Sequence, residues 1–271
     1  MRHKDRAILF DLGDTLIHYG DVDRRRVFEH TARRTYALWA SRNQRMPGYR
    51  RYYLHHWGAM MWGNLKTTVF RREMDAMRLI RRACRKLWLD APQSFFDELM
   101  WRWYEPLLRI ATVEPDTRDV LQALQSRGFA LGIVSNTFVP GWVLDRHLEL
   151  VGLLPYFPVR VYSADVRYRK PDRRIFEMAL DQLDVDPSRA MFVGDLYSTD
   201  IVGAERAGLK PVWKRSNGAI NGSADRPCTI HRLNELPDLA AELLPAPSPP
   251  AAKPRRTAAC AEQPCPAPTA G

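Results

Sequence analysis

The sequence lacks an uninterrupted apolar run that could cross a membrane, which would need about 18 residues without charge. It also lacks a signal-peptide pattern. The first ten residues, MRHKDRAILF, pass from charges straight into a short hydrophobic segment with no cleavage site. We therefore expect a soluble cytoplasmic protein that does not bind membranes.

Cysteine is scarce, with four residues in a chain of 271. Cys84, Cys228, Cys260 and Cys265 lie far apart or in a proline-rich segment, and they form neither a CxxC pair nor a histidine-containing set with zinc-ligand spacing. We expect reduced thiols rather than a disulfide framework or a zinc site.

Apolar residues make up 45% of the chain, which is enough for one core with an insertion or for two small domains. Residues 245–271 are the exception, because 8 of these 27 positions are proline and 8 are alanine. A segment with so little apolar bulk cannot pack a core, so a disordered tail is expected there.

The positive charge is concentrated in one segment. The formal net charge is +10, and residues 24–109 contain 19 Lys and Arg against 7 Asp and Glu, a local net of +12. Such a surface favours anionic partners, either a phosphorylated small molecule or a nucleic acid backbone. Arginines at helical spacing can equally solvate the outer faces of helices, and the sequence leaves both interpretations open.

Between residues 19 and 110 the hydrophobic pattern is helical. Two sets of apolar residues recur at helical spacing: Phe28, Ala32 and Trp39, and then Phe70, Met74, Met77, Cys84 and Trp88. A third helix is expected at SFFDELMWRW, with Ser94 as its N-cap and Asp97 three residues later. Six of the eight tryptophans lie here, and such aromatic residues usually pack a core. We expect a small helical domain over residues 19–110.

From Asp116 onwards, helices and strands alternate. Helices are expected at PDTRDVLQALQSRG, which Gly128 closes, at residues 141–150, at PDRRIFEMALDQL with Pro171 in its first turn, and at STDIVGAERAG. Strands are expected at residues 7–11, FALGIVSNT, PVRVYSA, RAMFVGD and KPVWK. This alternation predicts an α/β fold with a doubly wound, Rossmann-like parallel sheet, built from residues 1–18 and 111–244.

Polar residues gather where these strands end. They are Asp11, Gly13 and Asp14 after the first strand, Ser135 and Asn136 after another, and Gly194 and Asp195 after a third. Ligands of open α/β sheets bind outside the carboxyl ends of the strands, so these residues should converge on one site. Lys170, which precedes a helix, could reach the same edge.

Four of these stretches, FDLGDTL, IVSNT, RKP and FVGDLYSTD, resemble in order the four motifs of the haloacid dehalogenase superfamily. The resemblance covers roughly residues 5–215. The helical segment lies where that family's helical C1 cap belongs. The resemblance implies a hydrolase with a Rossmann-like core and an inserted helical cap domain.

The resemblance also implies a role for several residues. Asp11 would be the nucleophile that forms an aspartyl-phosphate. Mg²⁺ would be bound by Asp11, by the backbone carbonyl of Gly13 and by Asp195, with Asp200 as a ligand or an orienting group.

Three further residues would contact the substrate according to the same resemblance. Ser135 would donate its hydroxyl, and neighbouring groups at Asn136 their N–H, to the phosphoryl oxygens. Lys170 would neutralise the charge that develops there.

One position departs from the family pattern. Family phosphatases usually carry an acid/base aspartate two residues after the nucleophile, where this chain has Gly13. Asp14 could replace that carboxylate if the glycine turns the chain, or it could bond nearby backbone N–H groups in a tight turn. We favour the turn, because adjacent side chains on extended backbone point to opposite faces.

The leading hypothesis is a magnesium-dependent phosphatase that acts slowly on a small phosphorylated metabolite. A metal-independent 2-haloacid dehalogenase is the first alternative. The second is a catalytically weak protein that binds a nucleic acid or a protein through its basic helical segment, with Trp39, Trp57 and Trp62 available to stack on bases. Nucleic acid is the less favoured partner. The sequence identifies neither the substrate nor the oligomeric state.

Overall fold

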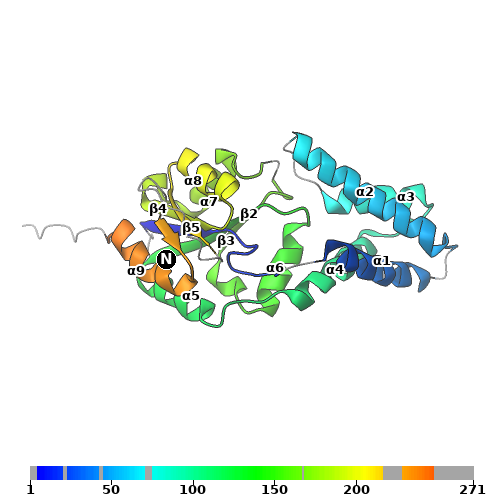
Figure 1. The fold of residues 1–271 in the computed structure, drawn as a ribbon, viewed down its shortest axis with the longest axis horizontal. Helices are drawn as coiled ribbons and strands as arrows, with labels where there is room; N and C mark the ends of the chain where they lie inside the picture. Colours follow the sequence, from blue (N-terminus) through cyan, green and yellow to red (C-terminus); the bar gives the residue numbers. More distant parts are fainter. Residues whose placement is uncertain are drawn as a thin grey trace, which may run out of the picture.

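The computed structural model describes residues 5–20, 23–42, 45–70, 75–166, 168–215 and 228–246 (Figure 1). Within these residues, six parallel strands form one sheet in the order β3-β2-β1-β4-β5-β6. The strands are β1 (Arg6–Phe10), β2 (Phe129–Ser135), β3 (Val159–Tyr162), β4 (Ala190–Gly194), β5 (Lys210–Lys214) and β6 (Cys228–Ile230).

Strand β1 is central and is buried along its whole length. Its alternate residues enter different apolar clusters, Ile8 and Phe10 on one face of the sheet and Ala7 and Leu9 on the other. A strand covered on both faces needs a continuous apolar sequence, which explains the run AILF.

Helices cover both faces of the sheet. The helices of this part are α5 (Thr117–Ser126), α6 (Gly141–Leu150), α7 (Arg173–Leu183), α8 (Val202–Arg206) and α9 (Leu236–Leu243). Buried residues of α7 and α8 pack in the cluster of Leu9, and those of α5, α6 and α9 pack in the cluster of Phe10. Figure 1 shows α7 and α8 on one side of the sheet and α5 and α9 on the other. The predicted doubly wound α/β fold is confirmed.

Four further helices lie between β1 and α5 in the chain and do not cover the sheet (Figure 1). They are α1 (Arg24–Ala40), α2 (Tyr49–Phe70), α3 (Ala76–Lys86) and α4 (Gln93–Ile110), and Figure 1 shows them as a group beside the sheet. We call residues 19–111 the helical insertion. Where the chain enters and leaves the insertion, His18 and Thr112 form an antiparallel bridge, and each backbone N–H donates to the other residue's carbonyl at 2.8 Å. The two segments that connect the insertion to the rest of the chain therefore lie side by side.

Aromatic packing holds the insertion together. The ring of Trp39 is fully buried and lies 4.5 Å from that of Phe95, centre to centre. The expected core role of the tryptophans is confirmed for Trp39, Trp101 and Trp103, which are buried. It is wrong for Trp62 and Trp88, whose exposed fractions are 54% and 90%. Trp88 is exposed because α3 ends at Lys86 and the chain turns at Trp88 with a φ of 61°.

Several predicted helix boundaries are wrong. Ser94 is not the N-cap of α4, because the helix begins at Gln93 and Pro92 occupies the cap. Pro171 precedes α7 rather than lying in its first turn, since Asp172 caps that helix and accepts a hydrogen bond from the Arg174 N–H at 3.0 Å.

The helix expected from Phe70 to Trp88 is divided. Phe70 ends α2, and α3 spans only Ala76–Lys86. Met74 lies outside the described residues. By contrast, Gly128 follows α5 with a φ of 87°, as predicted for a C-terminal glycine.

Two other expectations concern parts of the chain described only in part. Of the predicted tail 245–271, residues 247–271 lie outside the described residues. The two cysteines among the described residues, Cys84 and Cys228, are free thiols. Among the described helices, none combines the length and the apolar character that a membrane span requires.

Candidate active site

The carboxyl ends of the central strands bring the predicted site residues together. Asp11 directly follows β1, and its backbone N–H donates to the Val193 carbonyl of β4 at 2.9 Å. Ser135 is the last residue of β2, and Asp195 directly follows β4. Because the strands are parallel and in register, these residues lie at the same edge of the sheet.

Three carboxylates and one ammonium form the centre of this site. Asp11, Asp195 and Asp200 each place a carboxylate oxygen within 4.8 Å of the others. The Lys170 Nζ lies 2.8 Å from an oxygen of Asp11 and 2.8 Å from an oxygen of Asp200. Lys170 and Asp200 are buried, at 2% and 0% exposure. With all four groups ionised, the acidic cluster (Asp11, Asp195, Asp200) exceeds the positive charge by two.

The electrostatics of the site reflect this excess. Burial raises the pKa of Asp11, and the charge of Asp200 adds to the effect, while Lys170 opposes it. Burial, followed by the charges of Asp11 and Asp200, raises the pKa of Asp195 to about 7. Burial alone would lower the pKa of Lys170, but the two carboxylates outweigh it, so the pKa is raised and the ammonium is retained. The acidic cluster thus has a deficit of positive charge.

The acidic cluster fits a magnesium ion. Mg²⁺ prefers hard oxygen ligands and is usually bound through one or two carboxylates while it keeps several waters. Three carboxylate oxygens within 4.8 Å of one another supply that donor set, and a divalent cation would balance the two excess negative charges. The cluster contains neither histidine nor cysteine, the ligands that softer metals favour.

Hydrogen bonds from neighbouring residues of the same segment hold the Asp200 carboxylate in place. The Leu196 N–H donates to its Oδ2 at 3.0 Å, and the Thr199 hydroxyl donates to its Oδ1 at 3.3 Å. The residue lies in a π-helix, Tyr197–Ile201, a form that is frequent at functional sites. A Cβ at Gly194 would lie only 2.4 Å from Asp200 Oδ2, so glycine is needed there for the aspartate to approach the end of β4.

Asn136 lies against the backbone of Lys170. Its Nδ2 donates to the Lys170 carbonyl at 3.1 Å, and its Oδ1 accepts from the Lys170 N–H at 2.8 Å. The Asn136 side chain therefore anchors Lys170, a role that the expected N–H contact to the substrate did not include. The backbone carbonyl of Ser135 accepts from the Ser163 N–H at 3.0 Å, and this links the ends of β2 and β3.

The loop after Asp11 answers the question about Asp14. Asp14 has a φ of 53°, its N–H donates to the Ile17 carbonyl at 2.7 Å, and its Oδ1 accepts from the Tyr19 N–H at 3.2 Å. These contacts are those of a turn, the interpretation that we favoured from the sequence. Gly13 is not crowded, since the nearest atom to an added Cβ would be Tyr19 Cε2 at 3.9 Å.

A hydrogen-bonded chain beside Gly13 was missed in the sequence. The hydroxyls of Tyr19 and Tyr104 lie 2.9 Å apart, and the Tyr104 hydroxyl lies 2.8 Å from His147 Nδ1. Tyr19 follows β1, Tyr104 belongs to α4 and His147 to α6. No spacing in the sequence connects three such distant residues, and only their packing brings them together.

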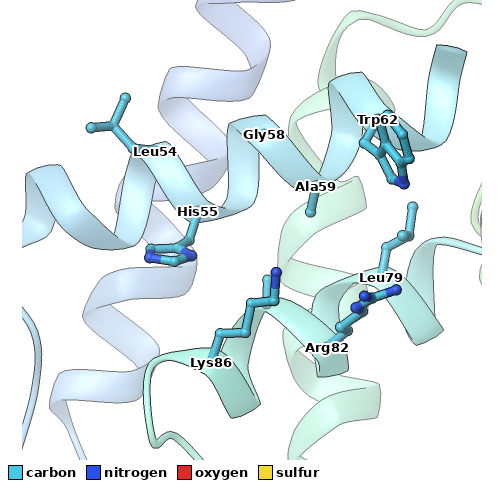
Figure 2. Close-up of a pocket in the computed structure, with 9 residues that line it drawn as sticks. Leu54, His55, Gly58, Ala59, Trp62, Leu79, Arg82 and Lys86 are labelled. Carbon is cyan, nitrogen blue, oxygen red and sulfur yellow. The ribbon is translucent and has the colours of Figure 1, made fainter.

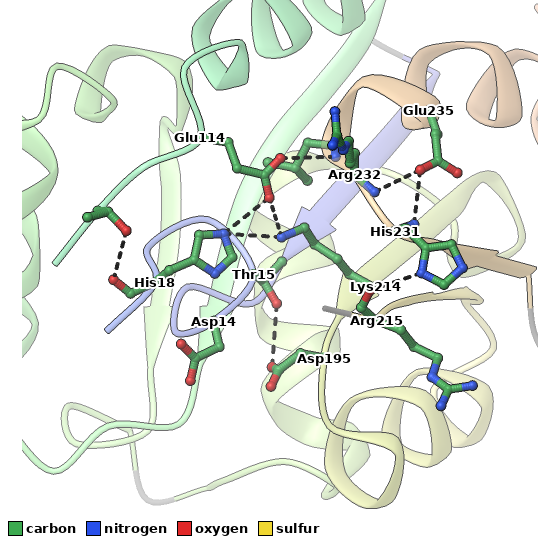
Figure 3. A network of polar contacts seen from close by, with 12 residues as sticks. Asp14, Thr15, His18, Glu114, Asp195, Lys214, Arg215, His231, Arg232 and Glu235 are labelled. Atoms are coloured by element: carbon green, nitrogen blue, oxygen red, sulfur yellow. Dashed lines mark hydrogen bonds and ion pairs between the residues drawn. The ribbon is translucent and has the colours of Figure 1, made fainter. Parts of the chain in front are cut away.

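A second polar network lies at the neck of the insertion, which is the place where His18 and Thr112 pair and the chain enters and leaves the insertion (Figure 3). Lys214, at 2% exposure, places its Nζ 2.6 Å from Glu114 Oε1 and 3.2 Å from His18 Nε2. Nearby, the Thr15 hydroxyl donates to Asp195 Oδ1 at 3.5 Å. His18 and Glu114, which lie just before and just after the insertion, thereby contact Lys214 of β5, next to the acidic cluster.

A cationic groove lies between α2 and α3 of the insertion (Figure 2). It encloses about 410 Å³ and is lined by His55, Trp62, Arg82 and Lys86 among others. Of the three tryptophans considered for base stacking, Trp39 is fully buried. Trp57 packs edge-on against Phe28 with ring centres 4.9 Å apart. The arrangement favours core packing over a stacking platform for these two residues.

A parallel sheet whose carboxyl edge carries a strand-end aspartate, an acidic cluster and a buried lysine is the arrangement of an α/β enzyme. Comparison with known proteins makes the class specific. The haloacid dehalogenase-like hydrolases match residues 6–208, and the chain belongs to this family. The resemblance seen in the motifs is confirmed.

Individual relatives include phosphatases and dehalogenases. A glyceraldehyde 3-phosphate phosphatase of Methanothermobacter thermautotrophicus is 35% identical over 103 residues, which cover 38% of this chain and 44% of that protein. The chain spans about half the length of the first curated relatives it matches.

Two solved structures share most of the fold. A HAD phosphatase of Thermococcus onnurineus is 25% identical, with a TM-score of 0.57 over 86% of this chain and 97% of that chain. A 2-haloacid dehalogenase of Pseudomonas syringae pv. Tomato DC3000 is 25% identical, with a TM-score of 0.62 over 88% and 98% of the two chains.

Proposed function

We propose that this hydrolase is a magnesium-dependent phosphatase that acts on a small phosphorylated metabolite through an aspartyl-phosphate at Asp11. The observation that carries the proposal is the gathering of three carboxylates, those of Asp11, Asp195 and Asp200, around the single ammonium of Lys170. Attack of a carboxylate on carbon does not require two additional acidic groups beside the nucleophile, whereas a cation-assisted attack on a phosphate does benefit from them.

Each residue then has a part in the reaction. Strand β1 and the hydrogen bond to Val193 hold Asp11 at the sheet edge, where its carboxylate can attack phosphorus in line with the leaving oxygen. When bound by Asp11, the Gly13 carbonyl, Asp195 and Asp200, Mg²⁺ offsets the repulsion between the attacking carboxylate and the phosphate.

The phosphoryl group needs donors as well as a nucleophile. The Ser135 hydroxyl donates to its oxygens, and Lys170 supplies positive charge next to Asp11. Asn136 keeps Lys170 in place through both backbone groups of the lysine. The helical insertion, with its net charge of +12 over residues 24–109, acts as a cap that favours anionic substrates.

Gly13 makes the enzyme slow. A positioned acid/base group contributes about 10²–10⁴-fold to the rate, and glycine has no side chain to move a proton. Asp14, which is held in its turn, does not replace that group.

A screen of phosphorylated metabolites with Mg²⁺ tests the proposal, with wild type compared with Asp11→Asn. We expect phosphate release by the wild type and only background release by Asp11→Asn. Asp238→Asn, the same change at an exposed carboxylate on α9, is the control and should keep full activity. Halide release from 2-haloacids without metal, together with no phosphate release, would establish the dehalogenase alternative instead.

A further inference from the structure

The Tyr19–Tyr104–His147 chain connects the helical insertion and the core at the position of the missing carboxylate. Tyr104 and His147 are buried, at 2% and 0% exposure, whereas Tyr19 is half-buried. A Cβ at Gly13 would lie 3.9 Å from Tyr19 Cε2, which is bonded to the carbon that carries the hydroxyl. The phenol thus lies beside the space that an acid/base side chain at position 13 would enter.

The histidine sets the direction of the hydrogen bonds. Burial lowers the pKa of His147 to about 4, so the ring is neutral near pH 7. Its Nε2 has no partner among the described residues. Unpaired buried N–H groups are rarer in proteins than unpaired acceptors, so the proton belongs on Nδ1, which donates to the Tyr104 oxygen. Tyr104 then donates to the Tyr19 oxygen, and the Tyr19 O–H remains available to another acceptor.

That acceptor is on the substrate side. In displacement at phosphorus, the leaving oxygen lies opposite the attacking oxygen. Asp11 projects from the carboxyl end of β1, so the leaving group extends away from the sheet. Tyr19 lies on that side, because its hydroxyl contacts Tyr104 of the helical insertion, and it is close enough to Asp11 for that carboxylate's charge to act on it.

We propose that the Tyr19 hydroxyl donates a hydrogen bond to the leaving oxygen, and that the enzyme selects phosphoanhydrides and aryl or enol phosphates, whose leaving groups depart as stable anions. This inference rests on the proposed phosphatase function. In the step, an Asp11 oxygen forms a bond to phosphorus, the bond from phosphorus to the leaving oxygen breaks, and the electron pair stays on that oxygen. No proton has to be transferred.

The choice of substrate class follows from the strength of the donor. Burial raises the pKa of Tyr19, so the phenol stays protonated and stabilises the developing charge without giving up its proton. An alkoxide needs a full proton to depart, and Gly13 cannot supply one. A phosphate or phenolate anion needs only the hydrogen bond.

The test is a series of aryl phosphates whose phenols range from strongly to weakly acidic, assayed with Mg²⁺. We expect the kcat/KM of the wild type to fall steeply as the phenol becomes a weaker acid. Tyr19→Phe should lose about ten- to a hundredfold on the weakly acidic phenols and much less on the strongly acidic ones. Gly13→Asp should flatten the dependence, because it restores a proton donor.

Tyr36→Phe is the matched control. It removes a hydroxyl in the same insertion that donates to the Pro47 carbonyl at 2.9 Å, and it should leave the whole series unchanged. Thermal unfolding of both variants establishes that they are folded.

The outcomes separate this inference from the function on which it rests. An equal loss across the series in a folded Tyr19→Phe variant would show a purely structural role and overturn the inference alone. Phosphate release that survives Asp11→Asn, or none by the wild type, would overturn both. A preference for alkyl phosphates over inorganic pyrophosphate would also contradict the proposed substrate class.

Discussion

Replacing Lys170 by methionine should leave the repulsion between the Asp11 and Asp200 carboxylates without the positive charge that now offsets it. In the wild type its ammonium lies 2.8 Å from both Asp11 and Asp200, and all three side chains are at least 90% buried. Two unit charges at most 4.8 Å apart repel by at least about 3 kcal/mol at an effective dielectric constant of about 20. We expect Lys170→Met to lower the free energy of unfolding by about this amount when both carboxylates are ionised.

The loss should depend on pH in a defined direction. Burial and Asp200 already raise the pKa of Asp11 in the presence of Lys170, and removal of the cation raises it further. The folded variant then binds a proton more tightly than its unfolded chain. The carboxyl therefore favours folding below its unfolded pKa, and this contribution is lost as the pH rises through the folded pKa, by up to about 1.4 kcal/mol per pH unit. The defect of Lys170→Met should be small in acid and full in alkali.

Urea unfolding over a range of pH, first with EDTA and then with Mg²⁺, measures both effects. Mg²⁺ should stabilise Lys170→Met more than the wild type, because it replaces the missing positive charge. Lys86→Met, on the exposed face of α3, serves as the control and should change little. A defect of the same size at every pH, or an equal response to Mg²⁺, would refute the reasoning.

Three further predictions concern the site and the neck. Because the pKa of Asp195 is raised to about 7, apparent Mg²⁺ affinity measured by calorimetry should weaken below that pH, by up to tenfold per unit, and Asp195→Asn should remove this dependence. Gly194→Ala should cost about 1–3 kcal/mol in thermal unfolding and reduce activity, because its Cβ would lie 2.4 Å from a carboxylate oxygen of the acidic cluster. Glu114→Gln should cost about 2 kcal/mol by leaving the Lys214 ammonium without a counter-charge, less than for a fully buried pair because Glu114 is 24% exposed. Although burial opposes it, Lys214 lowers the Glu114 pKa, so the wild-type advantage in urea unfolding should be present above the unfolded pKa and lost as the pH falls through the folded value.

The sequence allowed the sheet and the location of the site to be predicted, because both depend on local patterns. A strand buried on both faces must be continuously apolar, and polar residues such as Asp11 and Asp195 can follow it only at its end. The alternation of helices and strands then implies that these ends meet. No comparable local pattern indicated β6 or α9, which are short elements at the edge of the sheet and beyond it.

The parts that could not be predicted depend on contacts between distant residues. The amide of Asn136 binds the backbone of Lys170, 34 residues away, and nothing in the motif IVSNT indicates that partner. Tyr104 and His147 look like ordinary amphipathic-helix residues until α4 packs against α6. Ser94 is a residue type that often caps helices, but α4 begins one residue earlier, at Gln93, with Pro92 in the cap position and no side-chain cap hydrogen bond.

The bridge between His18 and Thr112 makes the fold modular. The 93 residues of the helical insertion begin and end at neighbouring backbone positions, joined by two hydrogen bonds of 2.8 Å. A tight two-residue turn could close the same gap, so the length and shape of the insertion are uncoupled from the path of the sheet. Exchanging the insertion between His18 and Thr112 would therefore replace Tyr19 and Tyr104 together and leave the acidic cluster at the sheet edge, so substrate preference could be changed by grafting without redesign of the cluster.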